Sequence, residues 1–301
     1  MSVHTESVSK FYGKQKALDN VSFNVNRGEI VGFLGPNGAG KSTMMKIISC
    51  FIPQNEGKVS VCGFDVVTQS MEVRKRVGYL PENNPLYLDM YVKEYLAFVA
   101  GIHKLGKETN QRIDYVIDKT GLAPELHKKL GALSKGYRQR AGLAQALIHD
   151  PEVLILDEPT SGLDPNQIVD IRHLIKEIGS EKTVMLSTHI MQEVEALCNR
   201  VIIINKGQIV ADSTTSDLQA ANKLQRTIVI EFQNQIDQNL LGSIEGVDEI
   251  TVENTIYRIK TGSKQDIRPD IFKTAGANNW IILSINLEES SLEDVFRQLT
   301  K

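Results

Sequence analysis

The sequence predicts an α/β fold whose mixed, mostly parallel sheet carries a phosphate-binding loop, followed by a small α+β domain. Three observations carry this prediction. A glycine-rich phosphate motif lies between an apolar run and a segment of helical period. Short apolar runs then alternate with helical segments as far as residue 197, which indicates parallel strands with helical crossovers. The chain of 301 residues is also too long for one typical core, so two domains are expected.

Composition narrows the class of protein. With 41% hydrophobic and 24% charged residues the sequence is typical of a soluble globular protein, and its net charge of −3 gives no electrostatic reason to expect nucleic-acid binding. No apolar run approaches the ~20 residues that cross a bilayer, and residues 1–6 lack the features of a signal peptide. Cys50, Cys62 and Cys198 form no C-x-x-C pair. We therefore expect them to be small core residues in a reducing cytosol and not disulfide partners or metal ligands.

The first strands and the phosphate loop occupy residues 17–48. Residues 17–25 alternate apolar and polar side chains as a half-buried strand does, and residues 29–34 form an apolar run typical of a buried strand. The next eight residues fit G-x-x-x-x-G-K-[ST] at every fixed position, and residues 42–48 continue at helical spacing. The predicted nucleotide-binding residues here are Gly35, Pro36, Asn37, Gly38, Ala39, Gly40, Lys41, Ser42 and Thr43.

This motif predicts a nucleoside triphosphate as ligand. Backbone N–H groups of the loop would point at the β-phosphate, and the following helix adds the positive end of its dipole. Lys41 would reach the β- and γ-phosphates, and the Ser42 hydroxyl would take one Mg²⁺ coordination position. A glycine-rich surface turn is the alternative, which the flanking strand and helix disfavour.

The middle of the chain combines a helical insert with further strand and helix pairs. Residues 71–132 contain few strand signals, and residues 92–100 and 112–117 have helical patterns, which indicates a helical insert within the α/β domain. Beyond the insert, the expected helices and strands cover residues 141–148, 153–156, 168–178, 183–186 and 191–197.

Two adjacent carboxylates end the apolar strand at residues 153–156. Asp157 would hold Mg²⁺, directly or through water, and Glu158 would orient or deprotonate the attacking water. The alternative is a surface acidic pair that caps the turn at Pro159 and Thr160. The phosphate loop expected in the same sheet favours the catalytic interpretation.

A second phosphate-binding helix end is expected near Ser134 and Gly136, which precede the helical residues 141–148. A serine hydroxyl and the N–H groups of a helix start can bind a phosphate. One triphosphate does not need two such sites in one chain, so the economical interpretation is that this end serves the γ-phosphate bound to another chain. An ordinary serine N-cap is the alternative, and by itself it would be the better one.

Three further candidates have weaker signals. His189 follows the strand at residues 183–188 and could reach the γ-phosphate, although a lone histidine is more often structural. Asp164 could equally be a turn residue. Tyr12 could pack in the core or present a face on which an adenine ring stacks.

The character of the sequence changes after a polar, linker-like segment at residues 213–224. Four short strands and two helices follow in the order strand-helix-strand-strand-helix-strand, which matches a ferredoxin-like unit. A last helix is expected at residues 291–297, and no catalytic cluster is evident in this part. The strands are expected at residues 227–232, 247–252, 255–260 and 280–286, and the helices at residues 235–241 and 264–275.

Taken in order, these features resemble the ATP-binding subunit of ABC transporters over about the first 220 residues. The motif most specific to that family is Leu133-Ser134-x-Gly136-x-x-Gln139, just ahead of the strand that ends in Asp157 and Glu158. The resemblance implies a role for each matching residue. Tyr12 would stack on adenine, Lys41 and Ser42 would bind phosphates and Mg²⁺, and Ser134, Gly136 and Gln139 would complete the partner's site; Glu158 would be the catalytic carboxylate, Asp164 would couple the two sites and His189 would hold the γ-phosphate.

Glu82 departs from the pattern of that family, which usually has Gln there. A carboxylate can still ligate Mg²⁺, but an additional anion near the γ-phosphate weakens its attraction unless the metal offsets it. Glu82 is therefore predicted as a metal ligand within the catalytic site. The Tyr-Leu-Pro-Glu form of residues 79–82 is similar to the ABC-2-type exporter branch, and residues 28–48 and 78–98 are most similar to its gliding-motility-associated ATP-binding subunits.

The resemblance implies an ATPase that drives transport through a separate membrane subunit, contacted near residues 82–95 on the inner face of the cell membrane. Two copies would close head to tail around two Mg-ATP. The ATP-binding domain is expected at residues 1–222, with its helical insert at about 83–132, and an accessory domain at residues 223–301. The competing class, a soluble ABC ATPase acting on ribosomes or nucleic acid, usually carries two cassettes or a long coiled-coil insertion, and this sequence has neither.

Overall fold

The computed structural model describes residues 1–217, 226–262 and 266–289, together with residues 293, 296 and 300. The chain divides into two compact units, Met1–Thr215 and Ser216–Leu299. The predicted domain boundary between residues 222 and 223 lies outside the described residues, as does most of the predicted last helix at residues 291–297.

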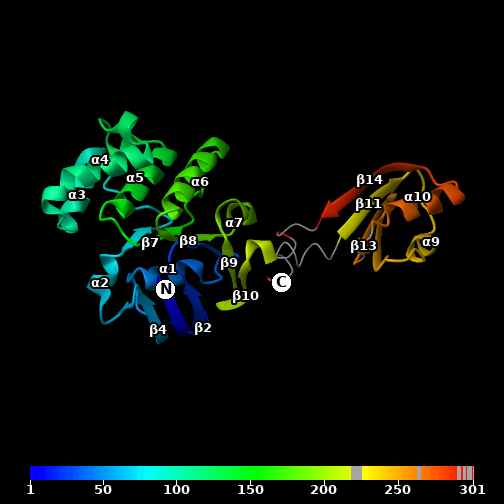
Figure 1. Ribbon diagram of the computed structural model, residues 1–301, viewed down its shortest axis with the longest axis horizontal. Coiled ribbons are helices and arrows are strands. Elements are labelled where there is room, and N and C mark those ends of the chain that lie inside the picture. Colours follow the sequence, from blue (N-terminus) through cyan, green and yellow to red (C-terminus); the bar gives the residue numbers. More distant parts are fainter. Residues whose placement is uncertain (218–225, 263–265, 290–292, 294–295, 297–299, 301) are drawn as a thin grey trace. The chain divides into compact units, whose positions relative to one another are not determined.

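A six-stranded sheet forms the centre of the first unit (Figure 1). All neighbouring strands are parallel except β10, which pairs antiparallel with β9 at one edge. Every residue of β3, β7 and β8 is buried, because both faces of this sheet are covered. The order across the sheet is β10 (Gln208–Thr214), β9 (Arg200–Asn205), β3 (Ile30–Leu34), β8 (Thr183–Thr188), β7 (Val153–Asp157) and β6 (Val77–Leu80).

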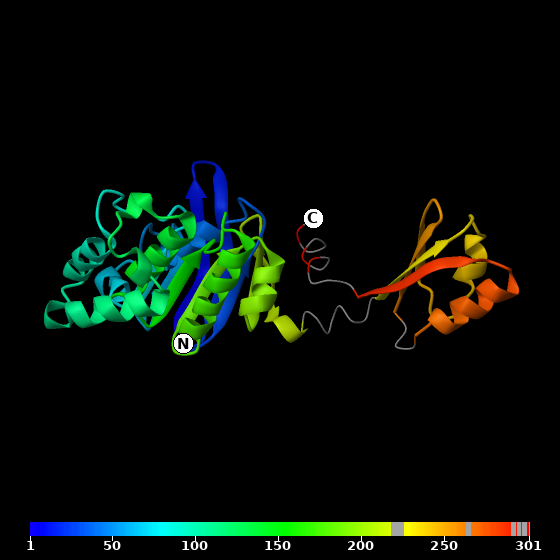
Figure 2. The same cartoon turned by 90° about the horizontal axis from the view of Figure 1, so that it is seen from above.

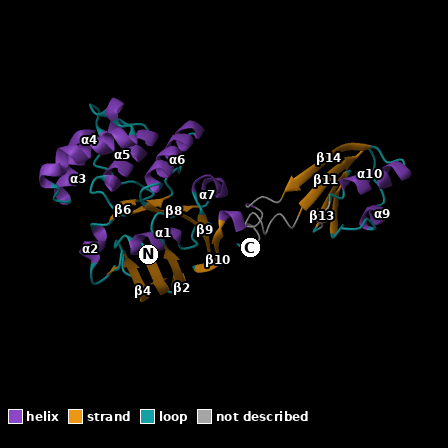
Figure 3. Cartoon of the chain, viewed as in Figure 1, coloured by secondary structure: helices purple, strands orange, loops and turns teal. Residues whose placement is uncertain are grey.

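A smaller antiparallel sheet lies on the other side of helix α1 (Lys41–Ile48), which contacts strands of both sheets (Figure 3). Its order is β2 (Gln15–Val25), β1 (Val3–Tyr12), β4 (Glu56–Val61) and β5 (Phe64–Asp65). The buried faces of the two sheets and of α1 form one continuous apolar core, which includes Phe23, Phe33, Met44 and Ile48. This core fixes the start of α1 against the end of β3.

Helices cover the opposite face of the six-stranded sheet (Figure 1). Among them, α3 and α4 pack on each other and on α5, which also contacts β6. The predicted insert at about residues 83–132 thus contains two α-helices and three short 3₁₀ helices. Just before it, β6 is a strand that the sequence pattern of residues 71–132 did not indicate. The helices on this face are α3 (Val92–Ile102), α4 (Thr109–Thr120), α5 (Lys135–Leu147), α6 (Pro165–Gly179) and α7 (Met191–Leu197), and the 3₁₀ helices are η1 (Gly106–Glu108), η2 (Ala123–Glu125) and η3 (Leu130–Ala132). Helix α2 (Ser70–Arg74) lies on the side of the smaller sheet and contacts β5 (Figure 1).

The predicted linker at residues 213–224 is wrong at its start. Ser213 and Thr214 belong to β10 and pair with Val201 and Arg200 of β9. Their polar side chains resemble a linker because β10 is an edge strand, on which exposed residues alternate with partly buried ones.

The second unit, drawn in yellow to red in Figure 2, has a four-stranded antiparallel sheet. The strand order of this sheet is β12-β13-β11-β14. One helix follows the first strand and another precedes the last, so the order of elements and of strands is ferredoxin-like, as predicted. Phe232 makes edge-to-face contacts with Tyr257 and Trp280 at centroid distances of 5.3 and 5.9 Å in a separate core. The elements are β11 (Arg226–Phe232), α9 (Gln238–Gly242), β12 (Glu249–Glu253), β13 (Ile256–Thr261), α10 (Arg268–Ala277) and β14 (Ile282–Glu289).

Together the two units confirm the predicted fold class. Among the described residues, no helix has both the length and the apolar character needed to span a membrane.

Candidate active site

The phosphate loop joins the end of β3 to the start of α1, and two of its glycines are required by its shape. Gly40 caps α1 with φ 110°, and a Cβ there would lie 2.5 Å from the Ala17 carbonyl oxygen. A Cβ on Gly35 would lie 2.4 Å from the carbonyl oxygen of Ile204. Any larger residue would therefore push the loop away from β2 or β9, and the N–H groups at the start of α1 would lose their arrangement.

Lys41 is the first residue of α1, and its ammonium group is surrounded by oxygen atoms. Its Nζ donates to the carbonyl oxygens of Gly35 at 2.8 Å and Pro36 at 3.3 Å, and it lies 3.5 Å from Oε1 of Glu158. Lys41 is only 5% exposed. Because the charge is held in a fixed place near the N-terminus of α1, an anion that enters the loop meets two positive groups at once.

Asp157 ends β7 next to the loop. Its Oδ1 accepts a hydrogen bond from Ser42 Oγ at 3.0 Å and another from Ser187 Oγ. Asp157 is 1% exposed, so its carboxylate is presented to the site through Ser42 rather than to solvent. This contact joins the start of α1 to the end of β7, as the paired strand ends of a parallel sheet allow.

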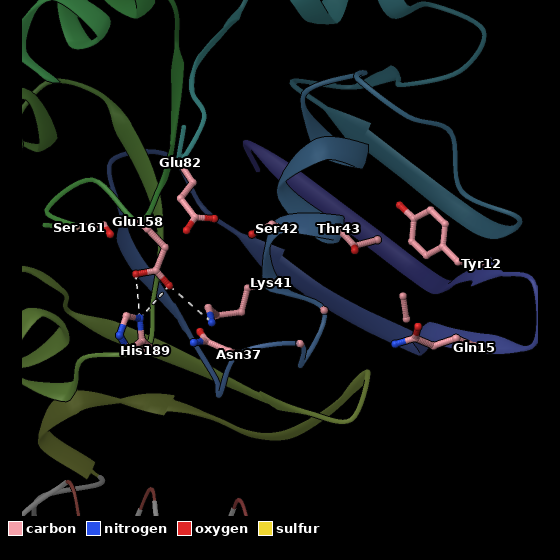
Figure 4. Close-up of a pocket in the computed structure, with 13 residues that line it drawn as sticks. Tyr12, Gln15, Asn37, Lys41, Ser42, Thr43, Glu82, Glu158, Ser161 and His189 are labelled. Carbon is pink, nitrogen blue, oxygen red and sulfur yellow. Dashed lines mark hydrogen bonds and ion pairs between the residues drawn. The ribbon is translucent and has the colours of Figure 1, made fainter. Parts of the chain in front are cut away.

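Glu158 follows Asp157 with a left-handed backbone, φ 50°. Its N–H donates to the carbonyl oxygen of Ser187 at 3.1 Å, which holds this uncommon conformation in place. The turn directs the Glu158 carboxylate toward Lys41 and toward Nδ1 of His189, which lies 3.0 Å from Oε2 (Figure 4). Glu158 is thus 7% exposed and has a cation and an imidazole as partners.

A cavity of about 500 Å³ opens in front of these groups (Figure 4). Tyr12 stands at one end of it, 49% exposed, and Glu82 and His189 lie at the other. The cavity brings together most of the predicted residues from segments far apart in the sequence. The lining residues are Tyr12, Gln15, Ala17, Asn37, Gly38, Gly40, Lys41, Ser42, Thr43, Glu82, Glu158, Ser161 and His189.

Three lining residues were not among the predicted site residues. Gln15 pairs with Tyr12 across the β1–β2 hairpin, so a hairpin prediction for residues 12–15 would have placed it beside Tyr12. Ala17 lies two residues further along β2. Ser161 follows the turn after Glu158, where its N–H donates to the Glu158 carbonyl oxygen at 3.1 Å.

Gly35, Pro36 and Ala39 shape the loop without lining the cavity: the carbonyl groups of Gly35 and Pro36 bind Lys41, and Ala39 is buried. Asp157 likewise lies behind Ser42.

Four more predicted residues neither line this cavity nor belong to the phosphate loop. Ser134 caps α5 and accepts from the Tyr137 N–H at 3.3 Å, and Asp164 caps α6 and accepts from the Gln167 N–H at 2.9 Å. Gly136 packs against Gln167, since a Cβ there would lie 2.7 Å from the Gln167 side chain. Gln139 is buried and donates to the Pro159 carbonyl oxygen at 2.8 Å. Within one chain, therefore, these residues make structural contacts and do not reach the phosphate loop cavity.

The donor set suits Mg²⁺. Magnesium prefers oxygen ligands and usually takes several of them from water and substrate phosphates. Ser42 and Asp157 offer two adjacent oxygens, and the Glu82 carboxylate lines the same cavity. Among the described residues there is no group of three or more acidic, histidine or cysteine side chains that could hold a metal unaided. The site therefore fits a Mg²⁺ ion that takes its remaining ligands from a bound triphosphate and from water.

Comparisons with known proteins agree with this geometry. Residues 18–161 match the ABC transporter family. Over 300 residues the chain is 36% identical to the uncharacterized ABC transporter ATP-binding protein YdbJ of Bacillus subtilis, covering 99% of this chain and 95% of the relative. This chain belongs to the family of ABC transporter ATP-binding proteins. It is also 33% identical to the bacitracin transport ATP-binding protein BcrA of Bacillus licheniformis, over 99% of this chain and 96% of that one.

A solved ABC structure is similar as well. The dimeric post-hydrolysis state of the ATP-binding cassette MJ0796, bound to ADP and phosphate, superposes with a TM-score of 0.65 at 27% identity, covering 70% of this chain and 98% of that chain. As an ABC cassette with a complete phosphate loop, the chain binds ATP and hydrolyses it to ADP and phosphate. The names of these relatives do not mention gliding motility, so that part of the resemblance stays a prediction.

Proposed function

We propose that this chain is the ATP-hydrolysing subunit of an ABC-2-type exporter. Two copies would close head to tail around two Mg-ATP, and the energy of closure and hydrolysis would drive a separate membrane subunit. The chain would then be cytoplasmic and held at the inner face of the cell membrane by that subunit. Support comes from the full-length similarity to BcrA, whose name includes bacitracin transport, and from the two-unit organisation of the chain.

In the proposed mechanism the start of α1 binds the triphosphate. N–H groups of residues 38–43 and the Lys41 ammonium group would bind the β- and γ-phosphates, and Lys41 would exchange its bonds to Gly35 and Pro36 for phosphate oxygens. Tyr12 would contact the adenine from the rim of the cavity. Ser42, Asp157 and Glu82 would hold Mg²⁺, which neutralises part of the phosphate charge.

Glu158 and His189 would act on the attacking water. The Glu158 carboxylate lies in the same cavity as Lys41, and its bond to His189 Nδ1 fixes its direction. Glu158 would accept a hydrogen bond from the water and orient it toward the γ-phosphorus, and His189 would face a γ-phosphate oxygen with Nε2, its other ring nitrogen. The observation that carries the proposal is this arrangement of Lys41, Glu158 and His189 around one cavity.

The test is Glu158→Gln, because the amide keeps the size of the side chain and removes its charge. We expect ATP hydrolysis to fall by about 100-fold or more while ATP still binds, since a general base typically contributes 10²–10⁴-fold. Phosphate release and nucleotide binding measured on the same protein check this. Glu152→Gln, at an exposed residue just before β7, is the matched control. Normal hydrolysis by Glu158→Gln would show that the base has been assigned to the wrong residue.

A groove at the junction of α1, α2, α3 and β6 is the proposed contact with the membrane subunit. It measures about 880 Å³ and is lined by four cationic side chains, Lys46, Arg74, Lys75 and Lys104. Phe51, Met71 and Ile102 also line it and are 72%, 64% and 62% exposed. No aspartate or glutamate is among its described lining residues. A membrane-subunit segment with apolar and acidic side chains fits this surface, and Pro85, in the predicted contact segment at residues 82–95, is one of its lining residues.

The partner class can be tested separately from hydrolysis. We expect the protein to co-purify with an integral membrane protein from detergent extracts and not to co-sediment with ribosomes or DNA. Co-sedimentation with either would instead favour a non-transport ABC ATPase.

A narrower proposal within the exporter branch is that the transporter serves gliding motility. It rests on the similarity of residues 28–48 and 78–98 to gliding-motility-associated subunits. Loss of surface spreading in a deletion strain of the source organism would support it.

A further inference from the structure

Glu193 is a buried carboxylate on α7 that does not line the ATP cavity. It is 1% exposed, and both of its oxygens bind threonine hydroxyls. Oε1 accepts a hydrogen bond from Thr160 Oγ1, and Oε2 accepts one from Thr188 Oγ1 at 2.6 Å. Burying a carboxylate costs free energy unless its oxygens are bound, so these two bonds fix both threonines to one rigid point on the helix.

The two threonines flank the proposed catalytic residues. Thr160 is 3% exposed and lies two residues after Glu158, in the tight turn closed by the Ser161 N–H and the Glu158 carbonyl oxygen. Thr188 is fully buried and immediately precedes His189. Its hydroxyl also accepts from the N–H of Ile190 at 3.1 Å, so one side chain binds the backbone on the far side of His189.

We propose that Glu193 is a positioning residue for ATP hydrolysis. It connects the loop of Glu158 to the loop of His189, and this connection holds Nδ1 of His189 about 3 Å from the Glu158 carboxylate. Glu193 acts only through Thr160 and Thr188, because it contacts neither the cavity nor Lys41. The inference rests on the catalytic roles given above to Glu158 and His189. A displacement of about 1 Å at such residues can slow a reaction 10²-fold without changing what binds.

The experiment compares two glutamates of the same helix. Glu193→Ala removes the connection, and Glu195→Ala, two residues along α7 and exposed, is its matched control. With the full-length protein we expect Glu193→Ala to lower kcat by about 100-fold with KM and ATP binding within about threefold of wild type, and Glu195→Ala to change neither. Glu193→Gln keeps the length of the side chain and can still bind both hydroxyls, so we expect it to restore kcat to within about fivefold of wild type.

Two isosteric variants keep the test decisive if Glu193→Ala does not fold. Thr160→Val and Thr188→Val each remove one hydroxyl, and we expect each to lower kcat by about tenfold at unchanged KM. Wild-type kcat in Glu193→Ala, or in both threonine variants, would overturn the inference. So would a loss of ATP binding equal to the loss of kcat, since that is what a merely structural role predicts. Glu158→Gln measured in parallel separates the two proposals: if it remains active, the catalytic assignment fails, and if only the Glu193 and threonine variants remain active, only this inference fails.

Discussion

Lys41 has three oxygen neighbours within 3.5 Å, which are two loop carbonyls and the Glu158 carboxylate. This arrangement holds a positive charge in place before any phosphate arrives. Fixed charges of this kind cost no reorganisation when the ligand binds, which is why a buried lysine suits the site better than a mobile surface one. The carbonyl oxygens of Gly35 and Pro36 are weaker partners than phosphate oxygens, so the proposed exchange of these bonds would favour ATP binding.

Removing that charge should therefore weaken ATP binding. We expect Lys41→Ala to raise the Kd for ATP by about 10- to 100-fold, because a hydrogen bond to a charged group contributes about 1.5–3 kcal/mol. Lys46→Ala, on the same helix but outside the cavity, is the control. Titration with a fluorescent ATP analogue measures both. Equal affinity of the Lys41→Ala and Lys46→Ala variants would show that the loop binds through its N–H groups alone.

The position of a site residue was predictable from the sequence only where the residues that determine it lie close together along the chain. The shape of the phosphate loop was predictable because its glycines and lysine lie within one turn of chain, and the positions of Glu158 and His189 near it because each follows a buried strand. Glu193 could not be identified, because its partners lie 33 and 5 residues away and no spacing rule connects them. For Gln139 the motif predicted nucleotide binding, and its contact with Pro159 shows a link from α5 to the Glu158 loop that the motif does not reveal.

At the scale of elements, a pair of stacked histidines connects α3, α5 and β6. His103, at the end of α3, stacks on His149, just after α5, with a centroid distance of 3.9 Å. Nε2 of His149 lies 3.1 Å from the Val77 carbonyl oxygen of β6. Burial, and then the nearby His103 and Arg112 charges, lower the pKa of His149 to about 4, while its bond to Val77 and Asp150 act in the opposite direction. Burial also lowers the pKa of His103.

This contact should make the first unit sensitive to acid. The folded-state pKa lies below the unfolded value of 6.5, so the unfolded chain binds the proton first and stability is lost as the pH falls from 6.5 toward 4. Between pH 7.5 and 5 we expect a loss of about 2 kcal/mol from His149. Urea unfolding at the two pH values measures it. His149→Gln should reduce that loss and His173→Gln, at an exposed residue of α6, should not; equal pH dependence of the two variants would contradict the assignment.

The cationic groove gives a second prediction at this scale. Lys75→Glu places a negative charge beside Arg74 on α2, where an acidic partner segment would bind. We expect less membrane subunit to co-purify while ATP hydrolysis by the isolated chain is unchanged, because the groove and the ATP cavity share no lining residue. Lys58→Glu, on the exposed part of β4, is the control. If the Lys75→Glu variant co-purified as much membrane subunit as the wild type, the contact with that subunit would have to lie elsewhere.

Elements with regular burial were predictable and irregular ones were not. The fully buried strands β3 and β7 have uninterrupted apolar runs. In β1 the pairing register shifts between Thr5 and Val8, which breaks the alternation that indicates a strand. In β6 the glycine at position 78 suggests a loop, but it is there because a Cβ would lie 2.2 Å from the Ala146 carbonyl oxygen of α5. In both β1 and β6, contacts with residues distant in the sequence determine the strand, and the local sequence pattern does not reveal such contacts.

At the scale of the whole molecule, the two units have separate cores. Both fold and function could be predicted for the first unit, but only the fold for the second. The ferredoxin-like order of the second unit followed from alternating strands such as β13, in which Tyr257, Ile259 and Thr261 are buried and the residues between them are exposed. Its function did not follow, because no catalytic cluster is evident in the sequence of residues 223–301. The composite site proposed for the dimer likewise depends on a second chain.

That composite site predicts the effect of a substitution far from the phosphate loop. Ser134→Arg places a long cation at the exposed start of α5, which does not line the ATP cavity of its own chain. We expect hydrolysis to be lost and ATP binding by the monomer to be unchanged, because the Ser134 helix end would face the nucleotide of the partner. A monomer that hydrolyses ATP at the rate of the dimer would refute this. Phosphate release measured across a dilution series makes the comparison.

Because Ser134 and Lys41 would serve different nucleotide sites of the dimer, two damaged variants of the protein should be able to complement each other when their subunits are mixed. At ATP concentrations well below the Kd of the Lys41→Ala variant, a homodimer of either Lys41→Ala or Ser134→Arg would turn over little ATP, since both of its nucleotide sites are damaged. In a mixed dimer the two lesions fall on the same site and leave the other one whole. Equal amounts of the two damaged proteins, allowed to exchange partners, should therefore recover about a quarter of wild-type turnover if the sites work independently.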